Sequence, residues 1–285
     1  MEYIKKHFRT FFQLAFTALT NGYIIGFFKG KIYRGKSKAV CVPGLNCYSC
    51  PGALGSCPIG SLQATLAGSS KSFPYYVVGF LLLFGVLFGR LVCGFMCPFG
   101  LVQDLLYKIK VKKLKVNKKV DKVLKYIKYV VLILFVIVFP LTLVNEFGIG
   151  TPTFCKWICP SGTLFGGIPL IATNKPLQNI IGFLFNWKVT LLMIFLITST
   201  LTYRPFCKYI CPLGAIYGMF NKFSIYNMEI EKDKCTNCKA CERVCKMNVE
   251  VTKNINSAEC IRCGECKRVC PQKCIKYTVK NNNNQ

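Results

Sequence analysis

The chain has 19 cysteines in 285 residues, and they dominate the chemistry available to it. Eight lie near the C-terminus in two runs that share the spacing C-x2-C-x2-C-x3-C, one beginning at Cys235 and one at Cys260. This spacing holds cubane iron–sulfur clusters, because three close thiolates bind one cluster and the fourth ligates the other. It therefore predicts two [4Fe–4S] clusters, with ligands Cys235, Cys238, Cys241 and Cys270 for the first and Cys260, Cys263, Cys266 and Cys245 for the second.

A pair of zinc sites is the alternative for such a tail, since C-x2-C also suits zinc. Two complete four-cysteine runs favour the clusters. Over about fifty residues the tail resembles the bacterial two-cluster ferredoxin domain. Lys246 stands where that family usually has proline, although the second run keeps Pro271 and no ligand is lost. Cys274 is left over, and we expect it to be a small buried residue.

A second cysteine motif, C-x3-C-P-x-G, recurs in the N-terminal part. It reads CGFMCPFG from Cys93, CKWICPSG from Cys155 and CKYICPLG from Cys207, and its second half recurs as CPIG at Cys57. On a helix, cysteines four residues apart project from the same face. The proline ends or kinks the helix at the second thiolate and can start a new one, whose amides would face an anionic cluster. The repetition predicts structural units of one kind.

Consecutive copies of this motif are separated by one apolar run, so copies one and three should share one side and copies two and four the other. Copies two and four then supply four thiolates for one further cluster, from Cys93, Cys97, Cys207 and Cys211. Copies one and three offer a second set, from Cys57, Cys155 and Cys159 plus either Cys50 or Cys47. Two alternatives stay open: small cysteines that pack between helices, and a metal-free quinone pocket shaped by copies two and four.

Four uncharged runs frame these motifs, at Thr10–Phe28, Pro74–Gly89, Tyr129–Asn145 and Val189–Tyr203. A spanning helix needs roughly 20 mostly apolar residues. The second and fourth runs reach that length if Arg90 and Lys188 snorkel to the interface. The chain is therefore expected to be mainly α, with a polytopic membrane domain of about four spanning helices over residues 1–226. A small α+β ferredoxin-like domain should follow over residues 227–285.

The net charge of +27 is concentrated between spanning runs rather than on a nucleic-acid recognition fold. Lys108–Lys128 holds ten lysines against one aspartate, which is the mark of a cytoplasmic loop. We therefore expect a cell-membrane protein with its N-terminus and tail in the cytoplasm, and no nucleic-acid partner. The lysines could instead attract an acidic soluble electron carrier. The basic and then apolar N-terminus lacks a clear cleavage site, which indicates an uncleaved first helix.

Arginine precedes the first cysteine by three residues in copies two and four, at Arg90 and Arg204. It could stabilise a thiolate or anchor a helix at the cytoplasmic interface.

Together these features resemble the NapH-type quinol dehydrogenases and the membrane part of NosR-type proteins. The motif residues that carry the resemblance are Cys93, Cys97 and Pro98, then Cys207, Cys211 and Pro212, followed by the tail cysteines. The resemblance implies that the chain moves electrons between a membrane quinone pool and a reductase partner. The extra copies at Cys57 and Cys155 depart from the family pattern. Proton-handling groups are scarce, because His7 is the single histidine and both Glu146 and Asp104 are expected to be interfacial residues.

Two functions of different classes follow. The first is an electron-transfer protein, which could be the electron-transfer subunit of an oxidoreductase. The second is an assembly or redox-sensing protein, similar to cytochrome-oxidase accessory proteins that handle copper. Copper sites favour methionine and histidine, and this chain has six methionines and one histidine, none grouped. We therefore favour electron transfer, with donor, acceptor, direction and the role of Cys41 left open.

Overall fold

The computed structural model describes residues 2–68, 73–114, 116–146, 148–179 and 181–279, and it is mainly helical. The helices before the tail are α1 (Glu2–Thr20), α2 (Ile25–Lys29), α3 (Pro58–Leu66), α4 (Tyr75–Phe88), α5 (Leu91–Phe95), α6 (Pro98–Tyr107), α7 (Lys118–Val131), α8 (Phe139–Thr142), α9 (Pro160–Gly162), α10 (Ile168–Thr173), α11 (Lys175–Gln178), α12 (Phe183–Leu201), α13 (Pro205–Tyr209) and α14 (Pro212–Phe220). A 3₁₀ turn, η1 (Lys36–Ala39), and three wider helical segments, η2 (Leu132–Val138), η3 (Phe154–Ile158) and η4 (Thr163–Gly167), complete this part.

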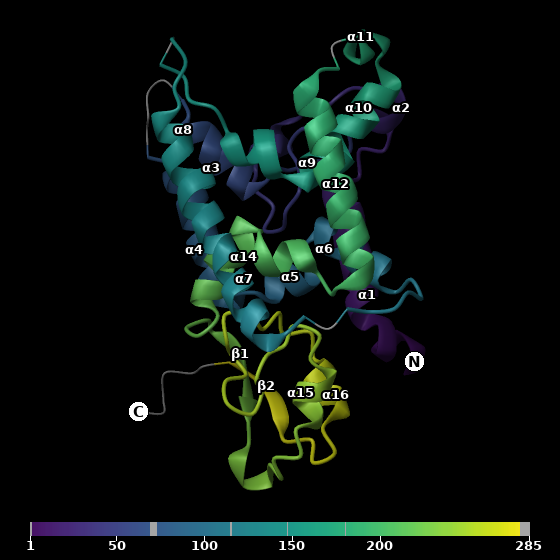
Figure 1. The fold of residues 1–285 in the computed structure, drawn as a ribbon, viewed down its shortest axis with the longest axis vertical. Helices are drawn as coiled ribbons and strands as arrows, with labels where there is room; N and C mark the ends of the chain where they lie inside the picture. Colours follow the sequence, from purple (N-terminus) through teal and green to yellow (C-terminus); the bar gives the residue numbers. More distant parts are fainter. Residues whose placement is uncertain (1, 69–72, 115, 147, 180, 280–285) are drawn as a thin grey trace.

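The cysteine motifs lie at two levels of the molecule. Figure 1 shows α3 and α9 toward one end, and α5, α6 and α14 nearer the tail. The long helices α1, α4 and α12, together with the continuous α7–η2–α8, run between these levels. Copies one and three of the motif therefore share one level, and copies two and four share the other.

Two helical stretches are long and apolar enough to cross a membrane. They are Lys119–Thr142, with a mean hydropathy of 2.2, and Phe183–Leu201, with 1.6. Within the described structure, only 28% and 17% of their apolar windows are buried. Exposed apolar surface of this kind is unusual for a soluble protein, which favours membrane spans over buried core helices for these two stretches.

The other two apolar runs differ from expectation. Thr10–Phe28 is not one helix, because α1 ends at Thr20 and the short α2 follows. The end of α1 is tied to the loop that carries copy one, since the amide of Leu54 donates to the carbonyl of Thr20 at 2.9 Å. Helix α4 fills most of the second run but has 14 residues, fewer than the roughly 17 needed to span.

Arg90 does not lengthen α4 by snorkelling, and that expectation was wrong. The chain turns at Gly89, which has a φ of +54°, and the side chain of Arg90 becomes fully buried. It reaches Glu259 and the carbonyl oxygen of Cys207 instead of the interface. Lys188 also points inward, and its Nζ donates to the carbonyl of Cys155 at 3.2 Å.

The tail is a compact α+β unit. Strands β1 (Tyr226–Ile230) and β2 (Ile275–Val279) pair antiparallel, with Tyr226 opposite Val279. Between them lie the turn η5 (Lys232–Lys234) and the short helices α15 (Ala240–Val244) and α16 (Glu265–Val269), which pack on each other. The two cysteine runs surround these helices.

A buried carboxylate holds α1, α6 and the start of α13 together. Both oxygens of Asp104 pair with the guanidinium of Arg204, at 2.8 and 2.5 Å. Arg9 and Gln13 of α1 also donate to Asp104, at 3.1 and 3.3 Å. The carboxylate is 4% exposed, so Asp104 is committed to a structural ion cluster.

This cluster makes a stability prediction. Asp104→Asn leaves two guanidiniums without their counter-charge, and breaking a buried pair typically costs about 3–5 kcal/mol. We expect that loss in the free energy of unfolding, measured by denaturant titration of the full chain in detergent. The matched control is Glu250→Gln, whose pair with Lys253 is largely exposed and should change stability by less than about 1 kcal/mol. Equal effects for the two variants would contradict a structural role for Asp104.

Candidate iron–sulfur sites

All four motif copies share one local structure at the second cysteine. Cys57, Cys97, Cys159 and Cys211 adopt extended backbone immediately before α3, α6, α9 and α14, and proline is the first residue of each helix. Proline suits this position because its fixed φ is helical and its missing N–H is not needed there. In copies two, three and four the first cysteine lies in a separate short helical segment that ends before the second cysteine, so the expectation that both project from one helix face was wrong.

The glycine of each motif brings a backbone amide to the second thiol. The amide of Gly100 donates to Cys97 Sγ at 3.4 Å. The amides of Gly60, Gly162 and Gly214 lie near the thiols of Cys57, Cys159 and Cys211 at the equivalent positions. A side chain at Gly214 would be crowded, because a Cβ there would lie 3.0 Å from the carbonyl oxygen of Cys207. Such amides stabilise an anionic sulfur.

Copies two and four bring four buried thiols together near the tail, and we name them the inner group: Cys93, Cys97, Cys207 and Cys211. Each thiol lies close enough to others of the group to interact electrostatically with them. The side chain of Gln103 also donates to Cys207 Sγ, at 3.0 Å. The inner group is therefore an all-sulfur donor set of the kind that iron–sulfur clusters use.

The two buried arginines join copies two and four, because each donates to a cysteine carbonyl of the other copy. Arg204 donates to the carbonyl oxygen of Cys93 at 2.6 Å, and Arg90 donates to that of Cys207 at 2.8 Å. Both arginines are fully buried. The alternative that they anchor helices at the cytoplasmic interface was therefore wrong. Spacing along the chain could not show that each arginine serves the other copy.

Copies one and three form an outer group, which consists of Cys47, Cys57, Cys155 and Cys159. These four thiols line a cavity of about 350 Å³, together with Lys188. The sequence left Cys47 and Cys50 as alternatives. The structure places Cys47 in the cavity, whereas Cys50 Sγ lies 3.7 Å from the amide oxygen of Asn21. Cys41 is buried where the chain pairs with Ser56.

The tail cysteines separate into the two predicted sets. The first set lines one small cavity, and its members are Cys235, Cys238, Cys241 and Cys270. Cys274 lines the same cavity, with its Sγ 3.3 Å from that of Cys270. It is buried as expected, but its place beside the first set was not foreseen, because it lies outside the repeated spacing.

The second set gathers Cys245, Cys260, Cys263 and Cys266, which interact with one another electrostatically. Burial raises the pKa of Cys260 to about 11 and that of Cys266 to about 12. Without a cation these thiols therefore stay neutral at pH 7, and bound iron would stabilise their thiolates. Among the described residues, no three acidic, histidine or cysteine side chains converge on one metal ion. A cubane instead offers a separate iron to each sulfur.

The backbone of the two runs follows one path. Left-handed residues recur at equivalent places, as Asn237 and Arg262, Lys239 and Gly264, and Asn248 and Lys273. A residue other than glycine in this conformation costs of order 1–3 kcal/mol unless its surroundings impose it. Arg262 shows such surroundings, because its guanidinium donates to the carbonyls of Phe88 and Asn221 at 2.9 and 2.7 Å.

Comparison with known proteins finds two family models that match parts of the chain. A family model described as a 4Fe-4S binding domain matches residues 73–117, 127–175 and 185–225, so it matches copies two, three and four. A second 4Fe-4S binding domain model matches residues 253–276, which include the run from Cys260. No solved structure matches the chain.

Curated relatives match over part of their length. An uncharacterized protein of Methanocaldococcus jannaschii is 31% identical over 177 residues, covering 60% of this chain and 57% of that protein. The methylamine utilization ferredoxin-type protein MauN of Paracoccus denitrificans is 30% identical over 199 residues, covering 68% and 62%. The ferredoxin-type protein NapH of Haemophilus influenzae is 25% identical over 170 residues, covering 58% and 50%. With the regulatory protein NosR of Stutzerimonas stutzeri also among its homologues, the chain is a homologue of ferredoxin-type proteins of the NapH/NosR kind and carries 4Fe-4S binding domains.

Proposed function

We propose that the chain is a membrane-bound electron-transfer protein whose cysteines hold iron–sulfur clusters at four places. The observation that carries this proposal is the grouping of sixteen cysteines into four sets of four: the two tail sets, the inner group and the outer group. When bound, [4Fe–4S] clusters exchange single electrons at potentials set by their surroundings. The proposed ligands are those sixteen cysteines.

The order of these sets along the molecule supports a path across a membrane. The tail lies at one end, the inner group is close to it, and α3 and α9, which carry the outer group, lie beyond (Figure 1). The hydrocarbon core of a bilayer is roughly 30 Å thick. Two groups at different depths divide that thickness into shorter steps than one group would.

The protein's own residues supply the electrostatic setting of the inner group. Four thiolates together concentrate negative charge, and Arg90 and Arg204 lie beside them fully buried. Arginine stays protonated under all ordinary conditions. Because a fixed positive charge favours the more negative state of a neighbouring redox group, these arginines would favour the reduced form. The burial of all four cysteines keeps water away from the site.

Orientation follows from the lysines of Lys108–Lys128. The start of α7 lies beside the tail (Figure 1), so both face the same side. The positive-inside rule makes that side the cytoplasm, and the outer group then lies toward the opposite side. The same lysines could attract an acidic soluble electron carrier to the tail.

A quinone partner is the second candidate, favoured by a cavity of about 1230 Å³ between α1, α5 and the tail. Phe8, Phe12, Phe88 and Phe95 line it, and so does Cys263 of the second tail set. An aromatic cavity beside a cluster ligand suits a quinone ring.

A Phe12→Trp variant, which narrows the cavity, should weaken binding of a soluble quinone analogue measured by calorimetry. Unchanged binding would count against this site.

The proposal predicts the iron content of cysteine variants. Because a set that holds one cubane contributes four irons, Cys97→Ser should lower iron by up to about four per chain. The measurement is iron and sulfide in full-length protein purified without oxygen, with the tail EPR signals retained. Cys47→Ser should have the same effect at the outer group.

The matched control is Cys50→Ser. Cys50 is buried close to Cys47 but lies outside the cavity of the outer group, so its loss should leave iron unchanged. If wild-type protein contains only about eight irons, and Cys97→Ser and Cys47→Ser do not reduce them, the inner and outer groups hold no cluster.

Orientation is tested separately. An epitope inserted at Lys175, the first residue of α11, should react in intact cells, whereas a C-terminal epitope should react only after the membrane is opened. This pattern follows from the placement of the lysine loop and tail in the cytoplasm. Epitopes that react from the same side would overturn the proposed topology.

A further inference from the structure

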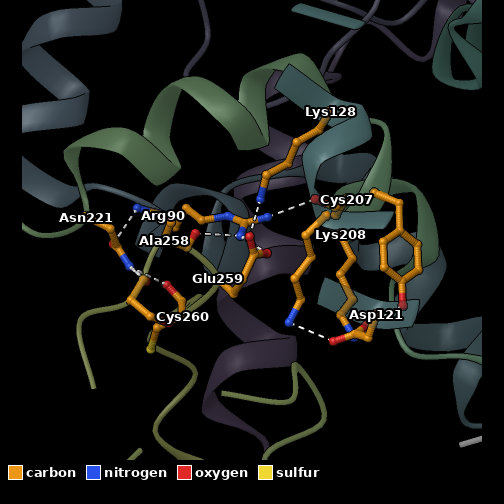
Figure 2. Close-up of polar contacts among 12 residues, drawn as sticks. Arg90, Asp121, Lys128, Cys207, Lys208, Asn221, Ala258, Glu259 and Cys260 are labelled. Carbon is orange, nitrogen blue, oxygen red and sulfur yellow. Dashed lines mark hydrogen bonds and ion pairs between the residues drawn. The ribbon is translucent and has the colours of Figure 1, made fainter. Parts of the chain in front are cut away.

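The tail contacts residues 1–226, called the membrane part below, through the segment that holds its second cysteine set. Figure 2 shows Glu259, the residue before Cys260, against the buried side chains of Arg90 and Lys128. Arg90 Nη1 lies 2.7 Å from Glu259 Oε2 and also donates to the carbonyl oxygen of Ala258 at 2.7 Å. Lys128 pairs with the other carboxylate oxygen. One carboxylate of the tail thus meets two buried cations of the membrane part.

Arg90 links this contact directly to the inner group. Its second terminal nitrogen, Nη2, donates to the carbonyl oxygen of Cys207 at 2.8 Å. A single guanidinium therefore bonds the backbone beside one proposed tail ligand and the backbone of one inner-group ligand.

Two further contacts fix the same segment. Asn221, which follows α14, donates its side-chain amide to the carbonyl oxygens of Ser257 and Cys260 at 2.6 and 2.9 Å. At Gly94, a Cβ would lie 2.5 Å from the carbonyl oxygen of Ile261. The absence of a side chain there lets the tail backbone approach the residue next to Cys93.

Lys246 makes a second contact, separate from that of Glu259, in another segment of the second cysteine set. It follows Cys245, at the position where the ferredoxin family usually has proline. Its ammonium lies 5.4 Å from the ring of Tyr107 and 5.5 Å from that of Tyr203, within the range of cation–π attraction. The two rings pack edge to face at 5.2 Å. The residue that departs from the family therefore also contacts the membrane part.

The first cysteine set has different surroundings. Cys238 is exposed, and so are its neighbours from Thr236 to Lys239. A soluble partner could reach this side of the tail, whereas the second set faces protein.

We propose that Lys246 and Glu259 are positioning residues of a fixed clamp, which holds the second cysteine set against the inner group. The tail then stays in a fixed position and passes electrons on to the inner group, rather than moving between partners on a flexible linker. Its first cysteine set is the one that soluble partners can reach. The relay order rests on the proposed function. The clamp itself rests on the contacts alone.

The test uses full-length protein with Lys246→Gln, Glu259→Gln and the double variant. The control is Lys253→Gln, which removes an exposed tail lysine from its pair with Glu250. Hydrogen exchange of residues 257–262 needs no metal, and we expect it to be at least tenfold faster in the double variant than in wild type or control. Lys246→Arg keeps a cation over the rings and should behave as wild type.

EPR of dithionite-reduced protein tests the relay order, provided that the variants keep their tail iron. Magnetic interaction between the tail and the inner group should weaken in the double variant. In the otherwise wild-type chain, Cys263→Ser should abolish the interaction and Cys238→Ser should preserve it.

The outcomes separate the two proposals. If the double variant keeps its iron and exchanges like the control, the clamp is wrong. If Cys238→Ser abolishes the interaction and Cys263→Ser preserves it, the order is reversed and the inference fails. If the inner group contains no iron, the proposed function fails there, and hydrogen exchange still decides the clamp.

Discussion

The exchange of two buried arginines between motif copies two and four is the contact on which the rest of the structure depends. A guanidinium without solvent must find carbonyl and carboxylate partners, and each arginine finds a cysteine carbonyl in the other copy. Their remaining nitrogens determine what else gathers there. Arg204 binds Asp104, which binds α1, and Arg90 binds Glu259, which belongs to the tail. The inner cysteines, the first helix and the ferredoxin-like domain are thus joined through two side chains.

Much of this site follows from residue order. Proline after the second cysteine predicts a helix start, and four helices do begin there. The alternating levels of the motif copies follow from one apolar run between each pair. The 4Fe-4S chemistry was also predictable, because the tail spacing is specific to cubane clusters and the comparisons agree.

Other features depend on contacts between residues far apart in the chain. Arg90 carries the same charge whether it snorkels or is buried, and Glu259, 169 residues away, decides the outcome. The hydrogen bond that ties the end of α1 at Thr20 to the loop at Leu54 joins residues that are not neighbours in the chain. Lys246 reads as a missing proline within the tail, and its role is visible only once Tyr107 and Tyr203 lie beside it.

The reciprocity of the arginine contacts has a consequence for how such a chain could arise. Residue i of one copy touches residue j of the other, and j touches i, which is the defining property of an isologous dimer interface. A polypeptide of half the length of residues 1–226, with one long helix pair and two motif copies, would supply motif cysteines to both the inner and the outer group by pairing with an identical molecule. Fusion of two such halves by gene duplication would preserve the contact and free each half to diverge. The ferredoxin-like domain occupies only one of the two equivalent positions, which is what such a fusion permits and a symmetric homodimer does not.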